Sequence, residues 1–168
     1  MRILGIDPGY ALMGWGIIDM KGNHFTPVAY DSISTSKDME PTDRLKCIYN
    51  SLMDIIAEYR PEVASIEELF FNSNVTTAIM VGEARGVAML ACSNSGVPVF
   101  EYTPLQIKQA LVGYGRADKK QVQQMVKMFL NLEKVPKPDD TADALAAAIC
   151  HGHSAGSIAR LSKLKSAL

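Results

Sequence analysis

The order of apolar and polar positions predicts three strands at the start of the chain. Residues 3–6 form a short apolar run that ends at Asp7, and a Pro-Gly turn follows at once, which is typical of a strand buried in a sheet. Residues 12–18 alternate with period two, and after a glycine-containing turn a third strand is expected at residues 25–33. Three consecutive strands joined by short turns predict an antiparallel meander, and Pro27 indicates an edge position for the third.

Helical spacing of apolar residues follows the meander, with Thr42 as the expected N-cap and Pro61 as the stop. A short apolar run at residues 63–66 predicts a fourth strand that ends at two glutamates. Further along, Thr103-Pro104-Leu105-Gln106 has a capping-box arrangement with proline at the first helical position. The other expected elements are a helix at residues 75–95 closed by Gly96, a strand at 97–100, a helix that ends at Gly113, and helices at 118–132 and 139–151.

This order of strands and helices is that of the ribonuclease H-like fold. We expect an α/β domain with a five-stranded mixed sheet, three antiparallel strands followed by two parallel ones, and helices on both faces. The crossovers would place the ends of the first and fourth strands side by side. The nuclease-type domain is expected to span residues 1–153, and residues 154–168, which are small, polar and basic, are expected to form a C-terminal tail.

Composition agrees with one soluble domain. The chain has 168 residues, of which 48% are hydrophobic, so it can bury a sizeable core. No apolar run reaches about 18 residues and no signal-peptide pattern follows Arg2, so we expect a cytoplasmic protein without a membrane segment. The three cysteines lie in helical patterns, which is typical of reduced core thiols. A zinc site at Cys150-His151-Gly152-His153 is not favoured, because this segment supplies too few ligands at unsuitable spacing.

The net charge of -1 conceals an uneven distribution of charge along the chain. Residues 38–68 carry eight acids against three bases, whereas residues 104–168 carry ten bases against five acids. A polyanionic partner near the C-terminal half fits this reversal, and ordinary solvated faces fit it as well. The bases that flank a glycine-rich loop there could follow phosphates, with a solvated helix start as the alternative. These candidate DNA-contact residues are Lys108, Arg116, Lys119 and Lys120.

Four carboxylates are expected to converge in this fold. Asp7 and Glu67 end neighbouring strands, and Asp140 and Asp143 stand three apart at the start of the last helix, so both project from one face. Clustered acids repel one another and a buried charge is costly, so the cluster needs protons or multivalent cations. Hard oxygen ligands select magnesium or manganese over zinc. Two such ions can activate a water and stabilise the leaving oxygen of a phosphodiester, which is nuclease chemistry.

In this interpretation Asp7 bridges two ions, Glu67 and Asp143 flank them, and Asp140 is a ligand or positions the attacking water. Each residue taken alone has a simpler explanation. Asp7 fits a turn, Glu67 fits a solvated loop start, and Asp140 or Asp139 fits a cap of the last helix. Their combination in this order of elements favours a single site.

Four motifs give the chain a resemblance to a known family: Gly5-Ile6-Asp7-Pro8-Gly9, Ile66-Glu67-Glu68-Leu69-Phe70, Gly82-Glu83-Ala84-Arg85-Gly86 and Ala142-Asp143-Ala144-Leu145-Ala146. From Arg2 to about His153 the chain resembles the RuvC Holliday junction resolvases. The resemblance implies a homodimer that uses magnesium, with manganese as a substitute, to cut two opposed strands of a four-way DNA junction symmetrically in homologous recombination and DNA repair. It also implies the branch-migration proteins RuvA and RuvB as partners.

The resemblance assigns roles to individual residues. The four acids that bind metal and catalyse the reaction would be Asp7, Glu67, Asp140 and Asp143. Phe70 would stack at the junction, and Lys108 and Lys119 would contact the backbone near the cut. An aromatic side chain directly after a strand is an odd feature unless it stacks on unpaired bases or packs under the loop. Glu68 departs from the family pattern, in which glutamine is frequent, and predicts an extra negative charge beside the site.

Three rival functions fit parts of the pattern. Actin-like kinases share this core, but they need two such domains and a second glycine-rich loop, which this length does not provide. A junction-binding protein without catalysis would use the acids structurally, and another ribonuclease H-like nuclease would act on RNA hybrids. Magnesium-dependent nicking of a synthetic junction separates these functions. The small residues of the helix at 75–95 fit a dimer contact or burial within the monomer.

Overall fold

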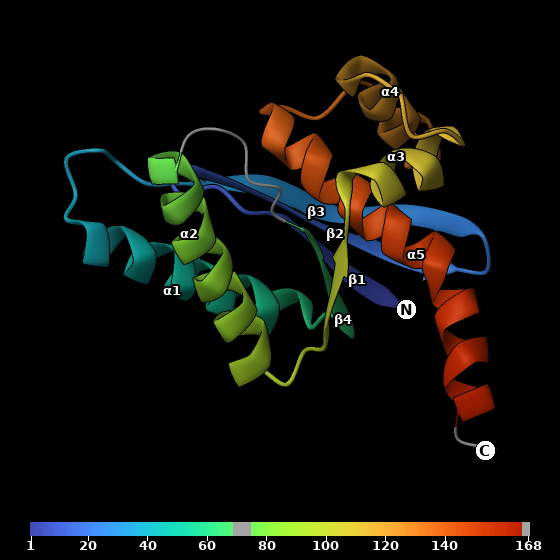
Figure 1. The fold of residues 1–168 in the computed structure, drawn as a ribbon, viewed down its shortest axis with the longest axis horizontal. Coiled ribbons are helices and arrows are strands. Elements are labelled where there is room, and N and C mark those ends of the chain that lie inside the picture. Colours follow the sequence, from blue (N-terminus) through green and yellow to red (C-terminus); the bar gives the residue numbers. More distant parts are fainter. Residues whose placement is uncertain (69–74, 166–168) are drawn as a thin grey trace.

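The chain folds around one five-stranded mixed sheet, as the order of elements predicts (Figure 1). The computed structural model describes residues 1–68 and 75–165. The strand order is β3-β2-β1-β4-β5, in which β2 runs antiparallel to both β1 and β3, and β4 runs parallel to β1 and β5. Pro27 lies on an edge strand, as predicted. The strands are β1 (Arg2–Asp7), β2 (Leu12–Lys21), β3 (His24–Ser34), β4 (Val63–Glu67) and β5 (Val99–Tyr102).

Helices cover both faces of this sheet, which also agrees with the prediction. Two helices pack on one face and three on the other, so that the buried apolar residues form two separate clusters (Figure 1). On the first face lie α1 (Pro41–Tyr59) and α2 (Val75–Asn94), and on the second lie α3 (Pro104–Val112), α4 (Lys119–Phe129) and α5 (Asp139–Lys165).

The strands divide their side chains between the two clusters by simple alternation. In β1, Leu4 and Ile6 belong to the cluster under α1 and α2, whereas Ile3 belongs to the cluster under α5. Successive side chains of a strand point to opposite faces of the sheet. Asp7 therefore shares a face with Ile3 and Gly5 and projects toward α5.

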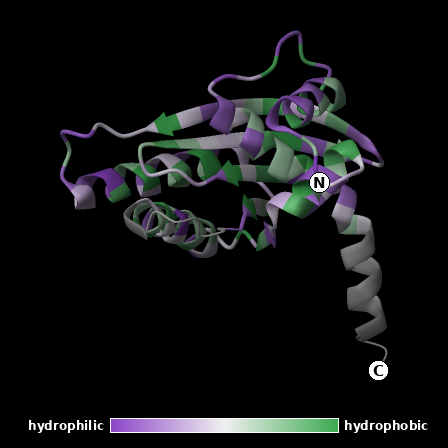
Figure 2. Cartoon of the chain, turned by 45° about the horizontal axis from the view of Figure 1, so that its top comes forward, coloured by the Kyte–Doolittle hydropathy of each residue, from purple (hydrophilic) through white to green (hydrophobic). Residues whose placement is uncertain are grey.

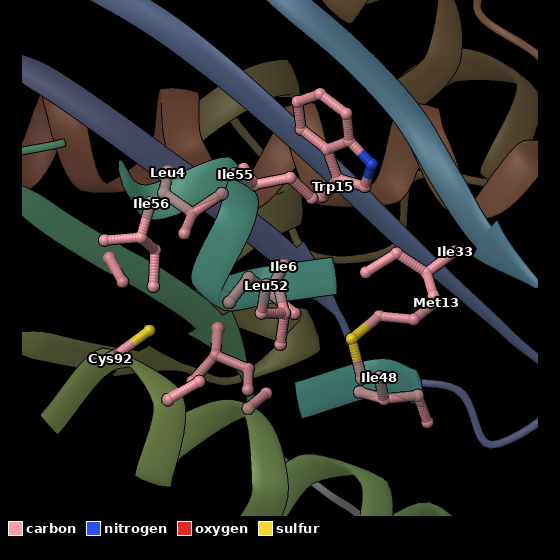
Figure 3. Close-up of a cluster of buried hydrophobic side chains, with 14 of the residues drawn as sticks. Leu4, Ile6, Met13, Trp15, Ile33, Ile48, Leu52, Ile55, Ile56 and Cys92 are labelled. Atoms are coloured by element: carbon pink, nitrogen blue, oxygen red, sulfur yellow. The ribbon is translucent and has the colours of Figure 1, made fainter. Parts of the chain in front are cut away.

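Large side chains fill the space between the sheet and α1. Figure 3 shows Ile56 and Leu52 of α1 beside Leu4 and Ile6 of β1, and Ile48 beside Met13 of β2. Leu52 and Ile48 are fully buried, and each such side chain stabilises the fold by about 1.5–3 kcal/mol relative to an exposed one. This face supplies much of the apolar burial that holds the sheet.

The opposite face is built for close approach of α5. A methyl group added at Gly5 would overlap the backbone carbonyl of Ala144, and one added at Gly14 would overlap the carbonyl of Asp140. The buried residues on this side of α5 are largely alanines, so the helix backbone lies directly on the sheet. The hydroxyl of Ser65 in β4 donates a hydrogen bond of 2.7 Å to the carbonyl oxygen of Ala147 in the helix.

Several element ends differ from the predicted ones: α4 ends at Phe129 rather than at 132 and β2 at Lys21 rather than at 18, and three further differences are larger or change a cap. Helix α1 begins at Pro41 with Glu40 as its N-cap, because Pro41 takes the first helical position, so the prediction of Thr42 as N-cap is wrong. Strand β5 spans 99–102 rather than 97–100, because Val97 turns into the apolar cluster directly after Gly96. Helix α5 continues to Lys165, well past 151, and Gly152, which lies against Phe25, does not interrupt it.

Apolar residues are concentrated in the strands and in the helix faces that cover them, while the connecting loops are more hydrophilic (Figure 2). None of the helices in the described part of the chain is long and apolar enough to cross a membrane. Cys92 and Cys150 are buried and Cys47 is half-buried, and all three are free thiols, as their helical positions indicate.

The contact between α5 and β2 leads to a testable prediction. Gly14→Ala should destabilise the protein by about 1–3 kcal/mol, because the added methyl group forces the start of α5 away from the sheet. Chemical denaturation measures this loss. The matched control is Gly156→Ala on the same helix, where an added methyl group meets open space and should be neutral or slightly stabilising. Equal stability of the two variants would contradict the close approach.

Candidate active site

The parallel pairing of β1 and β4 brings the first two acids together. Ile6 pairs with Ile66, so Asp7 and Glu67 follow at the same edge of the sheet. Both strands run in the same direction and both acids are the last residues of their strands. Since Ser65 already faces α5, alternation places Glu67 on that face as well, beside Asp7.

The start of α5 supplies the other two acids. Asp140 and Asp143 lie in its first two turns, and the backbone of Asp140 rests on Gly14 of β2, the partner of Asp7 in the antiparallel pair. The neighbouring Thr141 is fully buried, which fixes the rotation of the helix. The helix therefore carries its two acids to the edge at which β1 and β4 end.

The four acids lie near enough to one another for their carboxylates to repel, and this repulsion contributes to raised pKa values in the site. Burial is the main cause that raises the pKa of Asp7 to about 8, followed by repulsion from Asp143, Glu67 and Asp140. Burial and then repulsion from Asp143 also raise the pKa of Glu67. A carboxyl group with such a raised pKa favours either a proton or a nearby cation.

The ammonium group of Lys119 lies beside the acids of this cluster. The Nζ atom of Lys119 is 2.8 Å from Oδ2 of Asp143 and 3.6 Å from Oδ2 of Asp139. Burial raises the pKa of Asp143, and the Lys119 ammonium opposes this rise. The sequence predicts a DNA contact for Lys119 but not its ion pair with Asp143. The position of Asp139 beside Lys119 is also not predicted from the sequence.

Helix capping explains how two lysines reach the acids. Thr103 accepts a hydrogen bond from the backbone N–H of Gln106 and the side chain of Gln106 accepts one in return, so the predicted capping box at the start of α3 is confirmed. Asp118 and Gln121 form a second capping box at the start of α4, directly before Lys119. The two boxes fix the helix starts from which Lys108 and Lys119 extend.

A pocket of about 290 Å³ opens beside the acids. Its charged lining comes from two acids and two bases of the predicted site, Glu67, Asp143, Lys108 and Lys119. The remaining lining is apolar and comes from α3, α4 and α5, at Pro104, Ile107, Val122 and Ala146. The pocket thus joins the carboxylates to the positive charges that were predicted to contact a phosphate backbone.

The other predicted contact residues lie elsewhere. Arg116 and Lys120 are exposed, and Lys120 lines a different pocket with Asp118 and Gln121. Phe70 lies outside the described residues. In the segment that was considered for zinc, Nδ1 of His151 is 2.8 Å from the hydroxyl of Tyr102, and Nδ1 of His153 is 2.9 Å from the carbonyl oxygen of Ala110. These contacts give both histidines a structural role.

The four acids fit a hard divalent cation by their chemistry, since all of their donors are carboxylate oxygens. In the described part of the chain, however, no three His, Cys, Asp or Glu side chains are arranged to hold a metal ion as they stand. The carboxylates lie near enough to repel one another without converging on one point, and Lys119 engages Asp143. Asp7, Glu67, Asp140 and Asp143 are the residues that would bind the ion.

Comparison with known proteins gives this site its family. The family model of the crossover junction endodeoxyribonuclease RuvC matches residues 3–151, which include all four acids. The chain belongs to the RuvC family. The RuvC protein of Alkaliphilus oremlandii is 59% identical to it over 165 residues, which cover 98% of this chain and 100% of the relative. That of Caldanaerobacter subterraneus subsp. tengcongensis is 58% identical over 161 residues, 96% of this chain and 98% of the relative.

Solved RuvC structures share the fold. The structure of Thermus thermophilus RuvC in complex with a Holliday junction substrate matches with a TM-score of 0.89 and 36% identity, over 92% of this chain and 94% of the other. The ribonuclease H-like architecture predicted from the order of elements is therefore confirmed. Membership of the RuvC family implies that the enzyme depends on a divalent metal ion.

The raised pKa of Asp7 leads to a prediction about stability without metal. Burial and the repulsion of neighbouring acids raise the pKa of Asp7 from its ordinary value of 3.8 to about 8 in the fold. Its contribution to stability is complete below the lower value and is lost as the pH rises through the higher one. We therefore expect the free energy of unfolding to fall between about pH 4 and pH 8, by at most about 1.4 kcal/mol per pH unit for one carboxyl group.

Chemical denaturation in the presence of a chelator, over this pH range, measures the slope. Asp7→Asn should flatten it, whereas Asp54→Asn, at an exposed position on α1, should leave it unchanged. A divalent cation should raise stability most at high pH, where the carboxylates are ionised. An unchanged slope in Asp7→Asn would contradict the assignment of the titration to Asp7.

Proposed function

We propose that this protein is a Holliday junction resolvase, a structure-selective endonuclease that nicks two opposed strands of a four-way DNA junction symmetrically. The observation that carries the proposal is the gathering of four acids beside a pocket that also contains two lysines, in a chain that matches RuvC proteins over nearly its full length. The reaction is the hydrolysis of a phosphodiester in homologous recombination and DNA repair. Magnesium is the metal, with manganese as a substitute.

The acids hold the metal and position the reacting groups. Asp7 is the shared ligand, because it is the carboxylate on which the repulsion of the other three converges. Glu67 and Asp143 are flanking ligands, and Asp140 is a ligand or positions the attacking water. Two ions held by these acids would supply an activated water and would stabilise the leaving oxygen of the phosphodiester. The ionised acids bind these ions through oxygen atoms alone, which selects magnesium over zinc.

The lysines bind the phosphate that is cut. Lys108 and Lys119 line the pocket with Glu67 and Asp143, so a phosphate at the acids lies within reach of both ammonium groups. Positive charge there offsets the repulsion between the DNA backbone and the carboxylates. Arg116 and Lys120 are exposed beside this pocket's helices and contact the backbone farther from the cut. Phe70 stacks on bases at the junction.

Symmetric cutting requires two sites, and α2 is the helix that we assign to the homodimer contact. Ile79 and Leu90 are 57% and 53% exposed, and their spacing of eleven residues puts them on one side of the helix with Gly86. Glu83 interrupts this apolar stripe. Exposed large apolar side chains on a helix next to glycine permit the close packing of a second copy.

The cellular setting follows from the family. The protein acts in the cytoplasm on junctions that the branch-migration proteins RuvA and RuvB supply.

Cleavage of a mobile four-way junction tests the proposed reaction. With magnesium the protein should nick two opposed strands at symmetric positions and leave linear duplex intact. Asp7→Asn should reduce cleavage by at least about 100-fold and retain junction binding, because it removes a metal ligand while keeping the shape of the side chain. Asp54→Asn, on the opposite face of the sheet, is the matched control and should cleave normally.

The outcomes separate the rival functions. Binding of the junction without cleavage in magnesium or manganese would support a junction-binding protein in which the acids are structural. Cleavage of RNA–DNA hybrids in preference to junctions would support another ribonuclease H-like nuclease. Either result would overturn the proposal.

The dimer contact is tested by charge substitution on α2. Ile79→Lys combined with Leu90→Lys should convert the dimer into a monomer in sedimentation experiments, because two buried charges would face each other across the contact. Met128→Lys is the matched control, since Met128 is a 69% exposed apolar residue on α4, on the opposite face of the sheet. A dimer that persists in the double variant would place the contact elsewhere.

A further inference from the structure

Lys119 occupies the position in which a cation is needed. Its ammonium group is 2.8 Å from Asp143, within hydrogen-bond distance, and 3.6 Å from Asp139. The side chain of Asp143 is 25% exposed and that of Lys119 is 54% exposed, so the ammonium reaches the half-buried acid from the solvent side. The ion pair neutralises one carboxylate of a cluster whose members repel one another.

We propose that Lys119 is a built-in counter-cation that competes with the divalent metal ion for Asp143, and that Asp139 is the positioning residue that receives Lys119 when it leaves. The inference rests on the proposed function, because it concerns the metal of that same site. It assigns a role to Asp139, which lies outside the set of four acids.

Lys119 and a metal ion compete because both are cations and both need the same carboxylate oxygen of Asp143. A carboxylate oxygen that accepts a hydrogen bond from an ammonium group is less available as a metal ligand, and two cations near one carboxylate repel each other. This engagement of Asp143 agrees with the finding that no three acidic, His or Cys side chains among the described residues are arranged to hold a metal ion. Lys119 must therefore move before the Oδ2 atom of Asp143 can act as a ligand.

Asp139 is placed to receive the ammonium group. Nζ of Lys119 is already 3.6 Å from its Oδ2 atom, so a change of side-chain rotamer is enough for transfer. The Asp118 capping box holds the start of α4, which leaves the movement to the side chain of Lys119. Lys137 holds the other oxygen of Asp139, with Nζ 2.5 Å from Oδ1. The carboxylate of Asp139 is thereby kept in place on the outer side of the site.

Binding of Mn²⁺ to the full-length protein without DNA tests the role of Lys119. The electron paramagnetic resonance signal of free Mn²⁺ measures how much of the metal is bound, independently of cleavage. Lys119→Met should bind Mn²⁺ about threefold to tenfold more tightly than the wild type, because a competing charge is removed. Lys119→Arg should retain the wild-type affinity or bind more weakly.

The matched control is Lys127→Met. Lys127 lies on the same helix, about 12 Å of axial rise farther along, and makes no ion pair among the described residues. Its loss removes the same charge and should change the affinity by less than about twofold. Thermal unfolding verifies that each variant is folded.

Two results would overturn the inference in distinguishable ways. Absence of saturable Mn²⁺ binding by the folded wild type would refute the proposed metal site, and with it the competition. Wild-type binding together with equal or weaker binding by Lys119→Met would refute the role of Lys119 alone and leave the proposed function standing.

A double-mutant cycle tests the role of Asp139. Asp139→Asn should weaken Mn²⁺ binding about twofold to threefold, because Lys119 then has only Asp143 as a partner. In the Lys119→Met background the same substitution should have no effect. If Asp139 acts only through its own charge, the weakening will be equal in both backgrounds, and that result would overturn its role as the acceptor of Lys119.

Discussion

The direct contact between α5 and the sheet is the constraint on which the site depends. Gly5 and Gly14 have no side chains, so the carbonyl groups of Ala144 and Asp140 can lie on the strands. With larger residues at these two positions, the helix would stand farther away, and its acids would no longer reach Asp7. Four carboxylates from three elements share one edge because two strands leave room for a helix backbone.

This arrangement sets stability against function. Bringing acids together in a half-buried site costs free energy, as the raised pKa of Asp7 and Glu67 indicates. The same unfavourable repulsion makes the site attractive to cations, since a ligand that binds only the folded state stabilises it. Lys119 relieves part of the repulsion through Asp143. The apolar core under α1 supplies the stability that allows the other face of the sheet to carry these charges.

The fold and the four acids could be predicted because they depend on local patterns. The alternation of apolar and polar residues predicts the strands, and the Thr103 capping box predicts the start of α3. The parallel crossovers predict that Asp7 lies beside Glu67. The position of Lys119 among the acids could not be predicted in this way. It depends on how α4 packs against α5, and helix packing is a tertiary property that no local pattern encodes.

Errors at element ends have a similar origin. Strand β5 was predicted two residues too early because Val97 is as apolar as any strand residue, yet its side chain enters the core as the chain leaves Gly96. Helix α5 was predicted too short because its composition becomes polar after the buried part ends. The start of β5 depends on where Val97 is buried, and the end of α5 depends on how far the helical backbone continues. Neither follows from the period of the hydrophobic pattern.

The alternation in β1 also explains why Asp7 cannot lie anywhere else. Leu4 and Ile6 are buried under α1, and Ile3 and Gly5 face α5. A shift of the strand by one residue would turn Asp7 into the apolar cluster and place Leu4 against the backbone of α5, where only glycine fits. Burial of an unpaired carboxylate and overlap with the helix would both oppose this shift. Asp7, the proposed metal ligand, therefore helps to specify the register of the strand that presents it, so the requirements of folding and of the proposed chemistry coincide at this residue.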